Sequence, residues 1–468
     1  MNAVGYILLA LVILGVLICF LRGIHAGMGA FLACMVFLPG MLGIELPGSL
    51  PQFTVHRILL LIALFFLARG GYLARGERPV THLRILLLFG FCQVLSFACG
   101  VSRVAGLKEC VDFAFEAVIF YIMVSAFLRW DGSAPRLLTS LCHGLAAVAL
   151  LAALQKYLGI GAIPYATPVA LIQWLDLSDI SSTYPHRILF GYAMAMGAPL
   201  ALGLAVASPE PGKRRRMLAI AVLLVAGSYF SGSRGPWIGM GLGLAAMGAL
   251  GGGAVRRRLA VLAALAVAVL VFRPGVRDTI TDLASSTVEE GSLKGASYQF
   301  RWQLWNVAWS EVRRSPVRFL FGYGPVSTES MDFTHYWDGQ EGGGASLEKI
   351  GYTSWDNNYA ADLIELGVAG FAVRLLLFAS IARALLANWR RADPQTRILR
   401  GAIAGSCLVF MFAMTNVFIF SPQLKYLFWA LVAIGSNPTW NLGELPVAQP
   451  AMVADEAAPA APIETVIS

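Results

Sequence analysis

Long apolar runs separated by short polar turns dominate the chain from the N-terminus to residue 436. Most of these runs are close to the roughly 20 residues that an α-helix needs to cross a bilayer. We therefore predict an all-α polytopic integral membrane protein with about 12–13 transmembrane helices, the two shortest being the least secure. The predicted helices are 4–21, 27–44, 57–74, 83–100, 110–128, 137–158, 186–207, 216–230, 236–253, 258–272, 357–382, 399–419 and 422–436.

Composition supports a membrane location. The 468 residues are 57% hydrophobic and only 13% charged, with a mean hydropathy of +0.69, whereas soluble domains carry about 25% charged residues. All seven cysteines lie in or beside apolar segments without a CxxC pair, which predicts small core side chains. Residues 4–21 lack a basic leader and a cleavage site, so we expect a retained first helix.

Basic residues gather in alternate connections between the apolar segments. The positive-inside rule assigns such clusters to the cytoplasm, so we predict that the N-terminus lies outside and the C-terminus inside. The formal charge of +8 then reflects topology and does not indicate a nucleic-acid partner. The clusters are Arg22; Arg69, Arg75, Arg78 and Arg84; Arg129 and Arg136; Lys213, Arg214, Arg215 and Arg216; Arg256, Arg257 and Arg258; and Arg390, Arg391, Arg397 and Arg400.

Three connections fall on the predicted outer side, namely 159–185, 231–236 and 273–356. The last is the longest non-membrane segment, and loops of that length are uncommon unless they are functional. The chain is therefore predicted to divide into N-terminal membrane helices, a large periplasmic loop, C-terminal membrane helices and a flexible tail. Their bounds are 1–272, 273–356, 357–436 and 437–468.

The long loop has its own recognisable pattern. It holds Trp302, Trp305 and Trp337 and a glycine-rich stretch at 342–344. Apolar residues at helical spacing over 297–314 predict a short amphipathic helix, which would lie on the membrane surface.

Arg234 is the most costly charge in the chain, because it lies between two apolar runs. Arginine at bilayer depth costs roughly 2.5–3.5 kcal/mol. The glycine and serine residues beside it, Ser233 among them, leave backbone N–H groups free to bind an anion. With Arg187 and Arg301 on the same side it could bind a diphosphate, since the guanidinium fork fits phosphate oxygens. The alternative is that each arginine snorkels to lipid headgroups or pairs with a loop acid.

Two acids follow the long loop. Asp356 begins the next helix, where it could cap the helix or act as a general base at the outer face. Glu365 lies nine residues further, about 13 Å deeper at 1.5 Å per residue. A carboxyl there is a functional candidate, although it could equally hydrogen-bond a neighbouring helix. Arg374, nearer the cytoplasmic end, is expected to snorkel.

Three further polar residues each allow two interpretations. Asp112 and Glu116 are four residues apart and share a helix face, which could form a proton path or, as we favour, a structural polar contact. His186 could titrate near neutral pH or cap the helix that follows it. The outer loops contain no HExxH, clustered His/Asp or DxD motif and the chain no P-loop, so neither a metal nor another cofactor is predicted.

In order and spacing, these pieces resemble the O-antigen ligase and polysaccharide polymerase family, over about 180–370. Pro185-His186-Arg187-Ile188 is similar to the family's His-Arg-Asn or Asn-Pro-Asn element, with Ile188 replacing Asn. Ser231-Gly232-Ser233-Arg234-Gly235 matches its Ser-Arg-Gly element closely. Arg301 and Trp305 with Gly322-Tyr323-Gly324 resemble the loop's Arg, Trp and Gly-x-Gly stretch. Asp356-Asn357-Asn358-Tyr359 and Glu365-Leu366-Gly367 resemble His-Asn-x-Tyr…Glu-Leu-Gly, with Asp356 replacing the His of most ligases.

The resemblance implies a metal-independent, inverting glycosyltransferase in a bacterial inner membrane, with its active site facing the periplasm. The donor would be a glycan on a polyprenyl (undecaprenyl) diphosphate, and the acceptor a growing glycan or lipid A core. Arg187, Arg234 and Arg301 would compensate the diphosphate charge, and Asp356 would take the acceptor proton. Supporting substrate contacts would come from His186, Ser233, Asn357 and Glu365. A chain-length regulator or other polysaccharide assembly proteins would be its partners.

The departure at Asp356 favours a polymerase of exopolysaccharide or O-antigen over ligation of O-antigen to the lipopolysaccharide core, and leaves both open. Two other classes also stay open. A transporter or flippase of lipid-linked glycan would favour internal repeats and polar residues deep in several helices. A non-catalytic scaffold in a polysaccharide assembly complex would tolerate loss of the arginines.

Overall fold

The computed structural model describes residues 3–40, 42–44, 52–73, 80–130, 134–159, 180–272, 281, 293–333, 336 and 355–440. Several sequence predictions fall outside these residues: most of the loop 159–185, Trp337, the glycine-rich stretch 342–344 and the tail from 441 onward.

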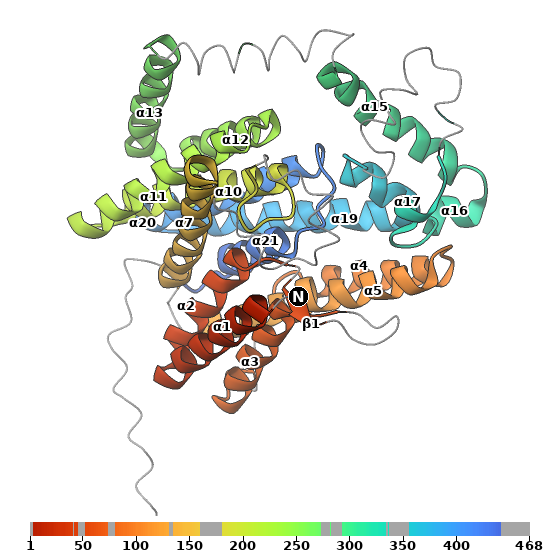
Figure 1. Cartoon of the computed structure of the whole chain (residues 1–468), viewed down its shortest axis with the longest axis horizontal. Helices are drawn as coiled ribbons and strands as arrows, with labels where there is room; N and C mark the ends of the chain where they lie inside the picture. The colour runs from red at the N-terminus through yellow and green to blue at the C-terminus, as the bar shows by residue number, and fades with distance from the viewer. Residues whose placement is uncertain are drawn as a thin grey trace, which may run out of the picture.

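Helices make up nearly all of the regular structure in this part of the chain (Figure 1). The N-terminal half contains α1 (Ala3–Arg22), α2 (Ile24–Phe37), α3 (Val55–Arg69), α4 (Leu83–Ala98), α5 (Arg103–Phe113), the π-helix η1 (Ala114–Ile119), α6 (Phe120–Trp130) and α7 (Ala134–Leu158). It is followed by α10 (Arg187–Ala207), α11 (Pro211–Phe230), α12 (Arg234–Leu250), α13 (Gly252–Phe272), α15 (Leu293–Val312), α16 (Pro316–Phe321), α17 (Ser327–Ser330), α19 (Asn358–Arg391), α20 (Pro394–Ala413) and α21 (Pro422–Ser436).

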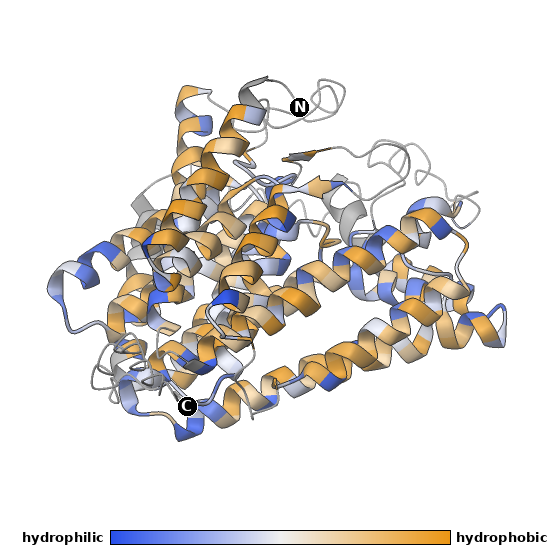
Figure 2. Ribbon diagram, turned by 90° about the horizontal axis from the view of Figure 1, so that it is seen from below, coloured by the Kyte–Doolittle hydropathy of each residue, from blue (hydrophilic) through white to orange (hydrophobic). Residues whose placement is uncertain are grey.

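Each predicted membrane segment coincides with an observed helix, which confirms an all-α polytopic membrane protein. Figure 2 shows apolar residues along the helices and polar residues gathered toward many helix ends. Five described helices are long and apolar enough to cross a membrane: Arg103–Arg129, Ala134–Leu158, Arg187–Ala207, Asn358–Arg391 and Pro394–Ala413. Shorter apolar helices are Tyr6–Arg22, Ile24–Phe37 and Leu83–Ala98. The total of 12–13 crossings stays a prediction.

Several predicted helix boundaries were wrong, as three examples show. The helix predicted over 27–44 ends at Phe37, two residues before Pro39, and β1 (Gly43–Ile44) then pairs antiparallel with β2 (Phe53–Thr54). The helix predicted from 399 begins at Pro394, because the Asp393 carboxylate accepts hydrogen bonds from the backbone N–H groups of the first turn. The helix predicted over 357–382 continues to Arg391.

The segment predicted over 110–128 is longer and contains an irregularity. The continuous span runs over Arg103–Arg129 and includes the π-helical turn η1. Such π-helical turns are rare and frequently lie at functional sites.

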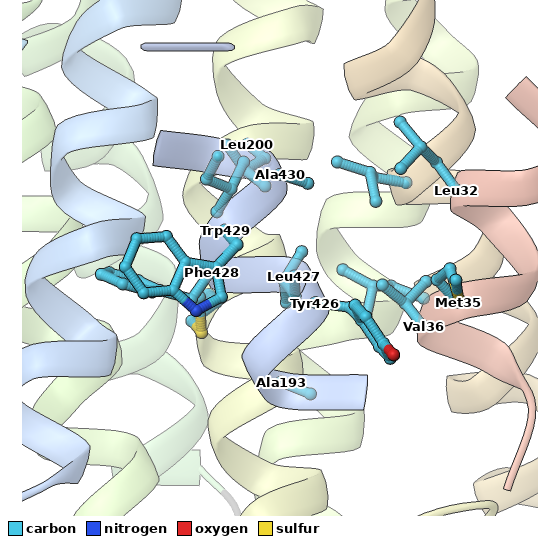
Figure 3. Packing of buried hydrophobic residues seen from close by; sticks show 14 of the residues in the cluster. Leu32, Met35, Val36, Ala193, Leu200, Tyr426, Leu427, Phe428, Trp429 and Ala430 are labelled. Carbon is cyan, nitrogen blue, oxygen red and sulfur yellow. The ribbon is translucent and has the colours of Figure 1, made fainter. Parts of the chain in front are cut away.

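The core is built around α10. Every residue from Leu189 to Ala205 is buried, as expected for a helix that is apolar on all sides. Figure 3 shows how α21 packs beside it: Tyr426–Ala430 lie between Leu32, Met35 and Val36 of α2 and residues of α10. Helices from both ends of the chain therefore share one apolar core.

Small residues allow close helix approach around this core. A side chain at Gly405 of α20 would overlap the backbone oxygen of Gly243 in α12, so the two backbones touch there. Gly203 of α10 likewise lies against Ala402 of α20. Such small-residue contacts are typical of helix packing in membranes, and they fix α20 against α12 and α10.

The amphipathic helix predicted in the long loop is present as α15, but its apolar face does not lie on lipid as predicted. Leu304, Val307, Ala308 and Val312 are buried in a second apolar cluster with residues at the start of α19. The helix of the long loop is therefore fixed to the membrane helix that carries the second half of the predicted site.

Candidate active site

An arginine–carboxylate pair joins α15 to the start of α19. The Arg301 guanidinium donates from one terminal nitrogen to Asp356 Oδ2 at 3.1 Å and from Nε to the Asp356 backbone oxygen at 3.3 Å. The side chains are 16% and 22% exposed, so the pair is half-buried and open to a ligand. The packing of α15 on α19 holds the two residues together.

Asp356 is not the cap of α19, a role that the sequence left open for it. The neighbouring Asn357 takes that position: its side-chain oxygen accepts a hydrogen bond from the backbone N–H of Ala360 at 3.2 Å. Asn357 is buried, whereas Asp356 is half-buried and turned toward Arg301. The Asp356 carboxylate is therefore not committed to the helix N-terminus.

Arg234 lies close to this pair. It is the first residue of α12, and its charge is near enough to that of Arg301 for the two to repel. Tyr192 of α10 packs at the same place, since a side chain at Gly235 would lie 2.7 Å from the Tyr192 hydroxyl oxygen. Two cationic groups held close to one another against repulsion form a site suited to an anion.

The remaining predicted residues of the first two motifs lie at neighbouring helix starts. His186 caps α10, with Nδ1 accepting from the Ile188 backbone N–H at 3.2 Å. Arg187 is exposed at the first position of that helix. One turn further, Gly191 packs against Ser231, which places the start of α10 beside the turn that carries Ser233 and Arg234. Ser233 is the N-cap residue of α12, without a side-chain capping bond.

The two glycine-containing motifs of the loop and of α19 bind each other through their backbones. Gly367 has φ 66° and ψ −174°, which interrupts α19. The carbonyl groups freed by this break accept hydrogen bonds from the other motif: Tyr323 N–H donates to Ile364 O at 2.9 Å, and Gly324 N–H to Glu365 O at 3.0 Å. The segment that carries Gly322-Tyr323-Gly324 is thereby anchored at the break in α19.

Arg374 does not snorkel, contrary to the sequence expectation. Its guanidinium donates to Asp362 Oδ1 at 2.9 Å and lies over the ring of Phe89. Residues twelve apart on a straight helix are separated by about 18 Å, too far for such a bond. The interruption at Gly367 lies between them and bends the helix enough to bring the pair together.

Glu365 is separate from the arginine–aspartate pair. It is buried, accepts a hydrogen bond from Thr328 Oγ1 at 2.6 Å, and lines a cavity of about 560 Å³. Asn358, two residues after Asp356, also lines this cavity, as does Pro185 beside His186. The predicted residues therefore fall into two adjoining regions.

Asp112 and Glu116 line the same cavity and make the structural contacts that the sequence favoured. Asp112 forms an ion pair with Arg57 of α3. Glu116, in the π-helical turn, pairs with Lys425 of α21 at 2.9 Å. The paired charges connect three helices that are distant in sequence.

A buried carboxylate organises the loop around the site. Glu311 is 1% exposed and accepts hydrogen bonds from the hydroxyl groups of Tyr323 and Tyr336 at 3.1 and 2.9 Å. Burial, followed by the negative charge of Glu311, raises the pKa of both tyrosines. Arg314 pairs with the same carboxylate at 2.8 Å.

Sequence reasoning missed several residues of this region. Tyr192 lies within a continuous apolar run, so nothing in the pattern marks it. Thr328 gives no motif signal either. Asp362 shares a helix face with Asn358, four residues away, and that spacing was the one available signal. Within the described residues, no group of three or more His, Cys, Asp and Glu residues suited to a metal ion occurs.

The fold and this site define a polytopic membrane protein with an arginine-rich, carboxylate-containing centre at one end of its helices. The model of the O-antigen ligase family matches residues 219–375, about one third of the chain. The chain thus carries an O-antigen ligase domain from α11 into α19, which confirms the resemblance seen in the motifs. Arg234, Arg301, Asp356 and Glu365 lie inside the matched segment, and Arg187 precedes it. A search of curated proteins finds no match.

Proposed function

We propose that the protein is a membrane glycosyltransferase that extends a glycan at the periplasmic face of a bacterial inner membrane. Its donor would be a glycan linked to a polyprenyl diphosphate, and its acceptor a second glycan or lipid A core. The observation that carries the proposal is the Arg301–Asp356 pair with the Arg234 charge beside it. The O-antigen ligase family supports glycan transfer from a lipid-linked donor.

The arginines and Asp356 suit a glycosyl transfer that takes place in one displacement at the anomeric carbon. Arg234 and Arg301 would bind the donor diphosphate, with Arg187 at the neighbouring helix start. The acceptor hydroxyl oxygen attacks the anomeric carbon as the bond from that carbon to the diphosphate oxygen breaks. The hydroxyl proton passes to the Asp356 carboxylate, and the lipid diphosphate leaves with its electron pair. One in-line attack inverts the anomeric centre.

The existing ion pair suggests how donor binding would prepare the base. In the free protein one oxygen of Asp356 accepts from Arg301. Diphosphate oxygens compete for the same guanidinium, because charge-assisted bonds to phosphate match its fork geometry. Donor binding would therefore weaken the contact between Arg301 and the carboxylate, which makes that oxygen of Asp356 available to the acceptor proton.

Polymerisation is the form of transfer that we propose, in exopolysaccharide or O-antigen biosynthesis, with ligation to lipid A core as the alternative. Asp356 stands where ligases of this family usually have His, and carboxylates serve as bases in many glycosyl transfers. The chemical step is the same in both cases. The acceptor alone distinguishes them.

The test uses Arg234→Lys and Asp356→Asn in cells that carry no other copy. Removing one contact that stabilises developing charge commonly costs about 10²–10³ in rate, so we expect shorter glycan chains and accumulation of lipid-linked intermediates. Arg313→Lys is the matched control, since Arg313 is an exposed arginine of the same loop region. Wild-type product from both site variants at normal protein level would rule out the proposed mechanism.

A further inference from the structure

The cavity beside the arginine–aspartate pair has features that the transfer step does not use. Its volume of about 560 Å³ falls within the roughly 300–1,000 Å³ of ligand pockets. It is lined by residues of α3, α4, α5, η1, α17, α19, α20 and α21. Most of these residues lie at the helix ends that the charge pattern assigns to the outer face, and the bend in α19 brings Arg374 to the same cavity.

The cavity wall combines apolar surface with many charged side chains, a mixture that a hydrocarbon chain does not match, and its balance of charges disfavours an anion. Six acids and four basic residues surround the cavity, so a negatively charged ligand would be repelled. Most of the basic groups are already paired with these acids. The acids are Glu109, Asp112, Glu116, Glu329, Asp362 and Glu365, and the basic residues are Arg57, Lys108, Arg374 and Lys425.

Several buried lining atoms lack a hydrogen-bond partner within the described residues. They are Gln93 Oε1, Thr183 Oγ1, Asp362 Oδ2 and Arg374 Nε. The first three residues are between 3% and 6% exposed. An unpartnered buried polar atom costs about 1–3 kcal/mol, so a ligand that supplies partners would recover that free energy. Three of the four atoms accept hydrogen bonds, and a ligand with several O–H groups provides the donors.

Aromatic side chains complete the lining. Phe113, Phe378 and Trp429 border the cavity and offer apolar faces between the polar groups. A mostly apolar wall with a few placed polar atoms is the usual composition of a small-molecule site. A sugar ring, with C–H faces and hydroxyl edges, fits both kinds of surface.

We propose that this cavity binds a neutral, hydroxyl-rich glycan unit, with Gln93, Thr183 and Asp362 accepting hydrogen bonds from its hydroxyl groups. The proposal rests on the glycan transfer proposed above and names the place of one sugar substrate. Asp362 lies four residues after Asn358, about 6 Å along the helix, and Asn358 follows Asp356 by two residues. A glycan held here extends toward the reacting centre.

The direct test measures binding of neutral methyl glycosides to the full chain in detergent by saturation-transfer difference NMR. The probes are methyl α-D-glucopyranoside, the galacto and manno isomers, and the negatively charged methyl glucuronoside. Gln93→Met with Thr183→Val removes two acceptors at nearly constant side-chain volume. We expect signals from at least one neutral glycoside, and roughly tenfold weaker binding in the double variant, since each neutral hydrogen bond contributes a few-fold.

The variant is expected to fold, because it removes polar atoms that have no partner in the free protein. Thr139→Val, which removes a hydroxyl that bonds its own helix in α7, is the control and should bind as the wild type does. Equal glycoside signals in wild type and double variant would overturn the proposal. So would the absence of any neutral-glycoside signal, or signals from the glucuronoside alone.

A second measurement separates this proposal from the proposed function. Arg234→Lys should lose transfer and keep glycoside binding, because Arg234 does not line the cavity. Glycoside binding that depends on Gln93 and Thr183 supports the pocket whatever Arg234→Lys does. If Arg234→Lys then makes wild-type product, only the proposed transfer mechanism fails. If Arg234→Lys loses product but glycoside binding does not depend on Gln93 and Thr183, only the proposal for the pocket fails.

Discussion

Gly322 and Gly367 lie backbone against backbone where the end of the long loop packs against α19. A side chain at Gly322 would overlap the carbonyl oxygens of Ile364 and Glu365, and one at Gly367 would lie 2.5 Å from the Leu320 carbonyl group. Both residues have positive φ, 70° and 66°, which favours glycine. The two family motifs are therefore the two sides of one junction.

Gly367→Ala should disrupt this junction. The φ/ψ combination at Gly367 is essentially restricted to glycine, and strain of this kind costs of order 1–3 kcal/mol before the overlap with Leu320 is added. We expect a lower unfolding temperature in detergent and loss of glycan product. Gly241→Ala is the control, since nothing lies within 4 Å of its added side chain, and it should behave as the wild type does. Unchanged stability of Gly367→Ala would contradict a tight junction.

The Arg374–Asp362 pair should stabilise the bent α19. The two side chains are 19% and 5% exposed, and removing one partner of a buried pair typically costs about 3–5 kcal/mol because the other charge is left uncompensated. Arg374→Met is therefore expected to be strongly destabilised in thermal unfolding. Arg374→Met with Asp362→Asn should recover part of that loss. Additive losses in the double variant would mean that the two residues do not interact.

Arg301→Lys separates charge from geometry at the proposed centre. Lysine keeps the positive charge but cannot donate from two nitrogens at once to Asp356 or to a diphosphate. We expect roughly 10²-fold slower product formation, measured as the rate of chain extension in membranes, with thermal stability close to that of the wild type. A rate equal to that of Arg313→Lys would show that the fork geometry at 301 is dispensable.

Tyr323 and Tyr336 of the long loop should have pKa values above that of an ordinary tyrosine. An ordinary tyrosine has a pKa of about 10, and burial together with Glu311 raises the pKa of Tyr323 and Tyr336 above it. As pH rises past 10, the unfolded chain loses these protons first, so this contribution to stability is present below pH 10 and declines above it. Tyrosinate absorbance of wild type minus Tyr336→Phe should rise only above pH 10. A difference that rises at or below pH 10 would contradict the buried contact with Glu311.

Topology can be tested on the two sides of α19. A reporter fused after Asp332, in the long loop, should report the periplasm, because the basic clusters are predicted to lie on the other side. A reporter fused after Ala392, between α19 and α20, should report the cytoplasm. A cytoplasmic signal from the Asp332 fusion would overturn the orientation and with it the periplasmic site, and the same compartment for both fusions would mean that α19 does not cross the membrane.

The sequence by itself determined the helices and the resemblance to the O-antigen ligase family. Apolar runs of bilayer length predict membrane helices because an unpaired backbone is too costly in lipid, and each predicted run coincides with a helix. The motifs around Arg187, Arg234, Arg301 and Asp356, taken in order, resemble the O-antigen ligase family, and the family model matches residues 219–375. Local signals gave these results because hydropathy and short motifs are properties of neighbouring residues.

Only the tertiary structure decided which charged side chains form ion pairs. Arg374 was expected at the lipid surface, yet the break at Gly367 turns it onto Asp362. Asp112 and Glu116 find their partners on α3 and α21, about 55 and 310 residues away. Helix periodicity shows which residues share a face but not which helix covers it, because that depends on how small residues such as Gly243 and Gly405 let helices approach. The cavity that Glu365 lines, and that Arg234 and Arg301 do not, exists only in that packing.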